Sequence, residues 1–236
     1  MKTEEKQMSE SLSIGILLAI VGGFLDAYTY ISRGKVFANA QTGNIVLFGV
    51  SLAEGEFYKA SLYFVPILAF ATGIFISDLI RDKYKKNSEY KLHWRQLVIF
   101  IELILLFCVS FVKQGDKDII VNVIVSFVCS LQVESFRKLR GKAYATTMCT
   151  GNLRSATASL VQYKDTKDKE KMKVSIRYYT IILFFIIGAS VGAILTNIFV
   201  EKSVIFCCII LLMIFICLYS ETSISYKIRN KRLNKR

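Results

Sequence analysis

A short polar motif occurs twice in this apolar chain. Thr-Gly-Asn stands at residues 42–44 and again at 150–152, and an acidic residue, Asp26 or Glu134, precedes each copy by 16 positions. Hydroxyl, amide and carboxylate groups can exchange hydrogen bonds with a solute, bind a cation or carry a proton. Glycine allows a sharp turn of the backbone. The pattern indicates binding of a small solute rather than covalent chemistry.

The predicted site residues lie in or beside the repeated motif. Asp26 and Glu134 are predicted to couple solute binding to a proton or another cation. The residues predicted to bind the solute are Thr42, Gly43, Asn44, Thr150, Gly151, Asn152 and Arg154. In the alternative interpretation the motif is a tight packing turn, and the two acids cap helices or pair with Arg154. Glu102, also in an apolar segment, is expected to extend its carboxylate to the cytoplasmic surface.

Long apolar runs place these residues in a membrane protein. The chain has 236 residues, 53% of them apolar, a mean hydropathy of +0.44 and a formal net charge of +13. The basic residues lie between the apolar runs, which favours membrane topology over nucleic-acid binding. A run of about 20 helical residues crosses a bilayer core. The predicted spans are about 12–32, 60–80, 96–113, 119–136, 178–200 and 203–221.

The two segments that contain the motif, 37–54 and 143–163, are rich in small and polar residues. If neither crosses the membrane, 24 Lys and Arg residues lie on the cytoplasmic side and six outside, leaving aside Arg154 of the second segment, with both termini cytoplasmic. Positive charge is concentrated on the cytoplasmic side of membrane proteins. The distribution therefore favours six spans, with each motif in a re-entrant or broken element.

The repeated motif predicts an all-α integral membrane fold built from two inverted three-helix repeats. Residues 1–113 would form the first repeat and 114–222 the second, followed by a basic cytoplasmic tail at 223–236. An odd number of spans forces the second repeat to enter from the opposite side. Non-helical backbone at membrane depth must be buried in protein or line a watery cavity. Both motifs are therefore expected near the midplane, between the repeats.

No cofactor, metal site or enzymatic activity is expected. The six cysteines show no CxxC spacing, and neither HExxH nor GxSxG occurs. The expected partners are the lipid bilayer and a small polar or anionic solute, the anion being favoured by helix N-termini and Arg154. Nucleic acid is not expected, and a homo-oligomer remains an open alternative.

The motifs also carry a family resemblance. Gly22–Ala27, Phe37–Asn44 and the second Thr-Gly-Asn resemble the YoaK family of small bacterial membrane proteins over nearly the whole chain. The resemblance implies a six-span protein of the bacterial inner membrane. It implies no substrate and no residue role, because the function of that family is unknown.

These features predict a transporter or channel for a small solute that works by alternating access. A membrane-embedded structural or regulatory partner is the alternative. In that case the charged loop predicted at 164–177 would contact anionic lipid or a soluble protein.

Overall fold

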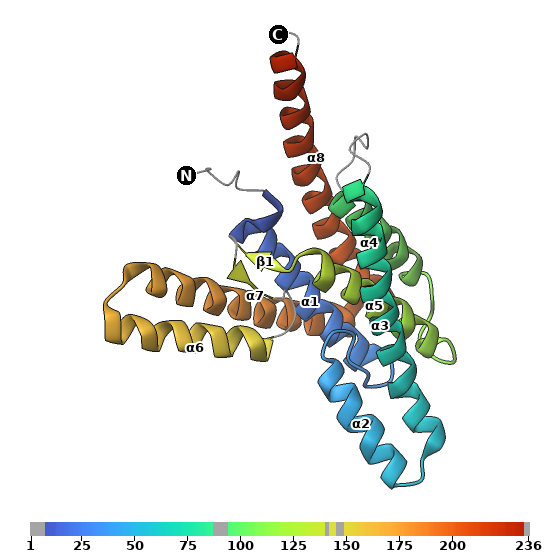
Figure 1. Cartoon of the computed structure of the whole chain (residues 1–236). Helices are drawn as coiled ribbons and strands as arrows, with labels where there is room; N and C mark the ends of the chain where they lie inside the picture. The colour runs from blue at the N-terminus through green and yellow to red at the C-terminus, as the bar shows by residue number, and fades with distance from the viewer. Residues whose placement is uncertain (1–7, 87–93, 140–141, 145–148, 234–236) are drawn as a thin grey trace.

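The computed structural model describes residues 8–86, 94–139, 142–144 and 149–233, which are almost entirely helical (Figure 1). Parts of three predictions lie outside the described residues. These are residues 1–7 and 87–93 of the first repeat, 140–141 and 145–148 of the second repeat, the latter in its motif segment, and 234–236 of the basic tail.

The helices follow the predicted order. The first half contains η1 (Met8–Glu10), α1 (Leu12–Ser32), α2 (Gln41–Ala53), α3 (Phe57–Lys86) and α4 (Trp94–Val109). The second half contains α5 (Asp118–Ser135), α6 (Cys149–Thr166), α7 (Lys169–Phe199), η2 (Val200–Val204) and α8 (Ile205–Leu233). Between α5 and α6, strands β1 (Lys138–Leu139) and β2 (Lys142–Ala143) form a short antiparallel hairpin that the sequence did not predict.

Local signals set several of these boundaries. The Ser11 side chain accepts a hydrogen bond from the Ile14 backbone at 3.3 Å and so caps the start of α1. After α2 the chain turns at Gly55, whose φ of +73° favours glycine. Asp168 caps α7 by accepting from the Glu170 backbone at 2.9 Å. This cap overturns one prediction, because most of 164–177 belongs to α7 and is not a loop.

Four helical stretches of the described chain are long and apolar enough to cross a membrane: Leu12–Ser32, Phe57–Tyr84, Asp118–Ser135 and Lys169–Ser220. The last contains both α7 and the apolar part of α8. The 16-residue α4 is shorter than these stretches, and α2 is a short apolar helix. The described chain is therefore almost entirely α-helical, with helices long and apolar enough to span a membrane.

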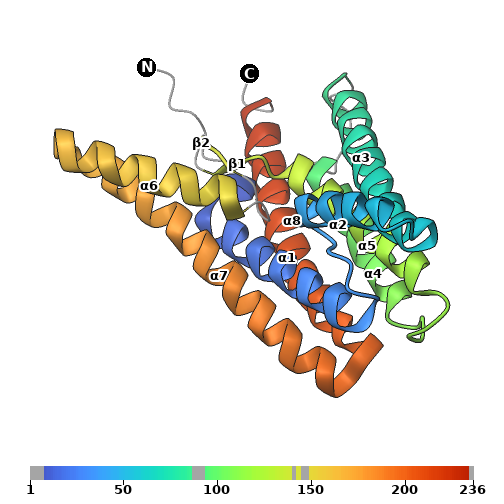
Figure 2. The same cartoon turned by 90° about the horizontal axis from the view of Figure 1, so that it is seen from below.

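Helices are exchanged between the two halves. Helix α1 of the first half packs along α7 of the second, and α5 of the second half packs along α3 of the first. Each motif helix pairs with the helix that follows it, so α2–α3 and α6–α7 form two helical hairpins that extend in different directions (Figures 1 and 2). Helices α4 and α8 pack against each other.

Glycines allow the closest helix crossings. A Cβ atom at Gly188 of α7 would collide with the Ile20 carbonyl of α1, and one at Gly192 would lie 2.9 Å from the Phe24 backbone. In the α3–α5 pair, a Cβ atom at Gly73 would collide with Ser130. Packing of this kind is the main attraction between helices in lipid. The spacing of Gly188 and Gly192 therefore serves helix packing.

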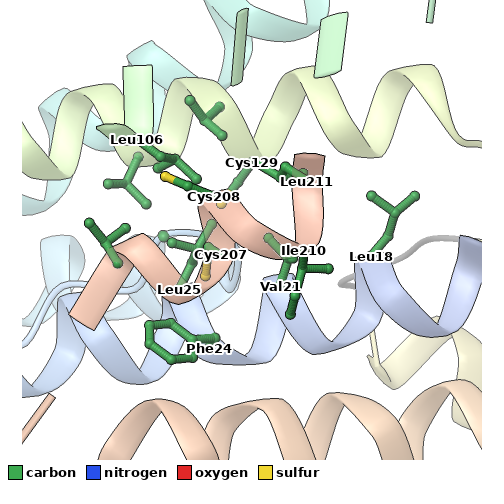
Figure 3. Close-up of a cluster of buried hydrophobic side chains, with 14 of the residues drawn as sticks. Leu18, Val21, Phe24, Leu25, Leu106, Cys129, Cys207, Cys208, Ile210 and Leu211 are labelled. Carbon is green, nitrogen blue, oxygen red and sulfur yellow. The ribbon is translucent and has the colours of Figure 1, made fainter. Parts of the chain in front are cut away.

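The largest apolar core lies where α1, α4, α5 and α8 meet (Figure 3). Phe24 of α1 stacks on Phe206 of α8, with ring centroids 5.4 Å apart. All six cysteines are free; Cys129, Cys207 and Cys208 are buried, Cys149 is half-buried, and Cys108 and Cys217 are exposed. This core fixes α1, which carries Asp26.

Candidate functional site: a cavity between the two motif helices

Both copies of Thr-Gly-Asn occupy the same place in a helix. They are the second to fourth residues of α2, which begins at Gln41, and of α6, which begins at Cys149. Neither copy interrupts a helix; each opens one. The first-turn N–H groups of a helix have no intrahelical acceptor and are available to other partners.

A cavity of about 630 Å³ lies between the two motif helices. Its wall combines both halves of the chain. The lining residues are Asp26, Ala27, Tyr30, Ile31, Phe37, Asn39, Ala40, Gln41, Thr42, Phe70, Cys149, Thr150, Gly151, Phe185 and Ala189. Of the nine predicted site residues, the structure brings four to this cavity: Asp26, Thr42, Thr150 and Gly151.

Asp26 joins α1 to the start of α2. Its carboxylate, 7% exposed, accepts hydrogen bonds through Oδ1 from the backbone of Asn39 at 2.7 Å and Ala40 at 3.4 Å. These residues directly precede α2, so Asp26 helps to position the N-terminus of that helix. Asp26 thus contacts the backbone 13 and 14 positions further on, just before the first motif.

Two residues of the first motif, Gly43 and Asn44, have a structural role. Asn44 is fully buried; its Nδ2 donates to the Phe37 carbonyl at 2.7 Å, and its Oδ1 accepts from the Phe37 N–H at 3.0 Å. A Cβ atom at Gly43 would lie 2.9 Å from the Phe37 ring. Neither residue lines the cavity, so both shape the turn that holds Thr42 there.

Glu134, the acid of the second half, does not occupy a position equivalent to that of Asp26. Glu134 accepts hydrogen bonds from Arg81 of α3 at 3.0 Å and from Arg137 at 2.9 Å, and it does not line the cavity. Asn152 is buried outside the lining, and Arg154 is exposed on α6. Arg154 therefore lies away from the predicted binding position, because it points out from the helix whose first turn lines the cavity.

The burial of two ionisable residues, Arg33 and Glu102, was not predicted from the sequence. Arg33 follows α1 and is fully buried, donating to Asp118 at 2.7 Å, to the Tyr28 hydroxyl and to the Val112 carbonyl. In the six-span topology Arg33 is one of the six Lys and Arg residues on the outer side, where exposure is expected. Glu102 does not extend to the surface as expected: it is fully buried, and neither carboxylate oxygen has a hydrogen-bond partner among the described residues.

The arrangement of helices and cavity belongs to a region that matches a known family. Residues 14–217 match the family described as "Protein of unknown function (DUF1275)". The chain belongs to the DUF1275 family. The matched region contains both motif helices and every lining residue of the cavity.

A curated protein similar to this DUF1275 chain is the UPF0700 transmembrane protein YoaK of Bacillus subtilis (strain 168). It is 25% identical over 181 residues, which cover 75% of this chain and 80% of YoaK. The resemblance predicted from the motifs is therefore confirmed. No solved structure matches the chain.

Proposed function

We propose that the protein is a transporter or channel for a small polar solute, which binds in the cavity between α2 and α6. The observation that carries this proposal is the lining itself, where Thr42 and Thr150 of the two motifs meet with Asp26. A volume of about 630 Å³ suits a small organic molecule. Polar groups with a buried acid at a junction of repeats are typical of solute sites in transporters.

The proposal includes six spans in two inverted three-helix repeats, in the inner membrane with both termini in the cytoplasm. The exchanged packing supports it, because α1 with α7 and α5 with α3 are the same pairing under a two-fold relation between the halves. The 13-residue α2 would be about 20 Å long, too short to cross a core of roughly 30 Å. Helix α2, and by the repeat α6, would then be re-entrant.

In this mechanism the solute alternates between the two sides while the cavity residues hold it. Thr42 and Thr150 would supply hydroxyl groups, and Asp26 would couple transport to a proton or cation. Arg154 is exposed outside the lining, so a basic side chain no longer supports an anionic solute. The paired Glu134 is better suited to holding α3 against α5 than to carrying a proton.

Cysteine accessibility tests this proposal in intact cells. In a cysteine-free background, Thr42→Cys, Thr150→Cys and Lys83→Cys would be probed with an impermeant thiol reagent. We expect Lys83→Cys to react only from the cytoplasm and the two threonine sites to react through water. Gly49→Cys, on α2 but outside the lining, is the control and should stay unreactive in lipid. Labelling of Lys83→Cys from outside, or no labelling at either threonine site, would overturn the proposal.

Transport itself is tested with Asp26→Asn in proteoliposomes. The amide keeps a carbonyl oxygen for the two backbone hydrogen bonds that hold α2, so the variant should still insert and fold. We expect transport to be lost or to become independent of the ion gradient. Full, gradient-dependent transport by the variant would remove the coupling role of Asp26.

One observation favours the alternative of a structural or regulatory partner. Exposed basic residues gather where α6 turns into α7, at the far end of that hairpin in Figure 1: Lys164, Lys167, Lys169 and Lys173. Such a cluster can bind anionic lipid or an acidic protein surface. A complex that survives purification, together with no stabilisation by any solute, would favour this alternative.

A further inference from the structure

The side-chain amides of Asn39 and Gln41 in the cavity wall differ in how many of their polar atoms are hydrogen-bonded. Asn39 lines the cavity and is 4% exposed; its Nδ2 donates to the Gly22 carbonyl at 3.0 Å, but its Oδ1 has no hydrogen-bond partner among the described residues. The Gln41 Nε2 also donates within the protein, to the Ala38 carbonyl at 2.9 Å. One N–H of each amide is thus engaged, while the Asn39 Oδ1 acceptor has no partner among the described residues. Such an acceptor costs free energy until a donor reaches it.

Asp26 lies beside this acceptor. The Asn39 N–H donates to Asp26 Oδ1, and the Asn39 side chain reaches back to Gly22, one helical turn before Asp26. A carboxylate can accept about four hydrogen bonds, so Asp26 keeps capacity beyond its two with the backbone of Asn39 and Ala40. Lys, Arg and His are absent from the lining residues. The polar end of the cavity therefore favours a ligand that brings positive charge and N–H donors.

Apart from Thr42 and Thr150, most of the rest of the wall is aromatic or apolar. Phe70 and Phe185 line the cavity from α3 and α7, and Tyr30 and Phe37 stack with centroids 4.9 Å apart. Aromatic rings attract cations over their faces within about 6 Å. The Tyr30 ring already has Lys35 at 4.8 Å, which leaves Phe70 and Phe185 for a ligand. The volume exceeds what a bare metal ion needs and suits an organic group.

We infer that the cavity binds a protonated amine that carries an apolar group. Its ammonium group donates to Asp26 and to the unpaired Asn39 Oδ1, and its apolar part packs against Phe70 and Phe185. This inference rests on the proposed function, because it names the class of solute. It also replaces the anion that the sequence favoured: Arg154 lies outside the lining, and the Asp26 carboxylate already accepts from the backbone N–H groups of Asn39 and Ala40 at the start of α2.

Thermal unfolding of the purified full chain in detergent tests the inference, with phenethylammonium as the probe. Phenylacetate reverses the charge of the probe, benzyl alcohol removes the charge, and Na⁺ alone removes the organic group. Phenethyltrimethylammonium keeps the charge but has no N–H donors. We expect phenethylammonium to raise the unfolding temperature in a saturable way and the trimethyl analogue to bind several-fold more weakly. Equal stabilisation by the anion, the alcohol or Na⁺ alone would overturn the inference.

Variants locate the effect in the cavity. Asp26→Asn and Asn39→Leu should each weaken phenethylammonium binding by about tenfold or more, as expected for loss of a buried charged or hydrogen-bonded partner. Phe185→Leu should weaken phenethylammonium more than methylammonium, and it tests the site even if a polar variant fails to fold. Glu102→Gln, an acid buried outside the lining, is the matched control. Unchanged binding in Asp26→Asn and Phe185→Leu would contradict the assignment.

Flux measurements separate the two proposals. If phenethylammonium binds in an Asp26-dependent way but wild-type and Asp26→Asn proteoliposomes take it up equally, the transport proposal fails and the binding inference stands. If the protein transports another solute and phenethylammonium neither binds nor competes, only the binding inference fails.

Discussion

Replacing Asp118 with alanine should remove the charged partner of a fully buried cation. The Arg33 guanidinium donates to Asp118 Oδ1 at 2.7 Å, to the Val112 carbonyl at 2.7 Å and to the Tyr28 hydroxyl at 3.0 and 2.7 Å. The Arg33 side chain has no exposed surface, and that of Asp118 is 20% exposed. The pair joins the end of α1 to the first residue of α5, so it also ties the two halves together.

The expected loss can be worked out from this burial. Breaking a buried ion pair by removing one partner costs about 3–5 kcal/mol, because the other charge stays buried. Asp118 is partly exposed and two neutral acceptors remain on Arg33, so we expect the lower end, about 3 kcal/mol. For a chain of this length 1 kcal/mol corresponds to roughly 2–4 °C, which gives a decrease of about 6–12 °C. Asp118→Asn keeps an acceptor and should lose about half as much.

Thermal unfolding in detergent, followed by the fluorescence of the single Trp94, measures this loss. Asp116→Ala is the matched control, because Asp116 is an exposed acid two residues earlier. Arg33→Met combined with Asp118→Ala should recover much of the stability, since it removes the unpaired charge as well. A decrease for Asp118→Ala no larger than that of Asp116→Ala would refute the reasoning that Arg33 depends on this carboxylate.

Three further substitutions test packing and buried polar groups by the same melts. Gly188→Ala should cost about 1–3 kcal/mol because its methyl group would collide with a carbonyl of α1, whereas Gly49→Ala, in open space, should cost nothing. Asn44→Ala should cost about 2 kcal/mol, because its buried amide bonds the backbone of Phe37 twice. Glu102→Met should raise stability by about 1–3 kcal/mol, as it removes two oxygens without a partner among the described residues; a decrease would reveal a partner.

Local signals explain why part of the fold could be predicted. The first apolar run was placed at 12–32, and α1 has these bounds, because Ser11 caps its start and a turn at Gly34 follows its end. The repeated motif predicted two special positions, and both copies open a helix beside one cavity. The bounds of α1 could be predicted because they depend on residues close together in the sequence.

The missed features depend on contacts between distant residues. Arg33 pairs with Asp118, 85 positions away, so the charge count placed it in water. The unpaired oxygen of Asn39 appears only once Gly22 has taken its amide donor. Glu134 precedes its motif by the same 16 positions as Asp26, but it pairs with Arg81 of α3, a contact that the spacing does not reveal. A single sequence holds no record of such pairings.

The exchange of helices constrains how the cavity could open. Because α1 packs along α7 and α5 along α3, the two halves of the sequence cannot separate as independent bundles without losing both pairings. The natural moving units are instead α1 with α6 and α7, and α5 with α2 and α3. The cavity lies between these units, since Asp26, Thr150 and Phe185 come from one and Thr42 and Phe70 from the other. Movement of one unit against the other would change access to Asp26 and leave both tight glycine crossings intact, but it would also have to break the Arg33–Asp118 pair that links α1 to α5.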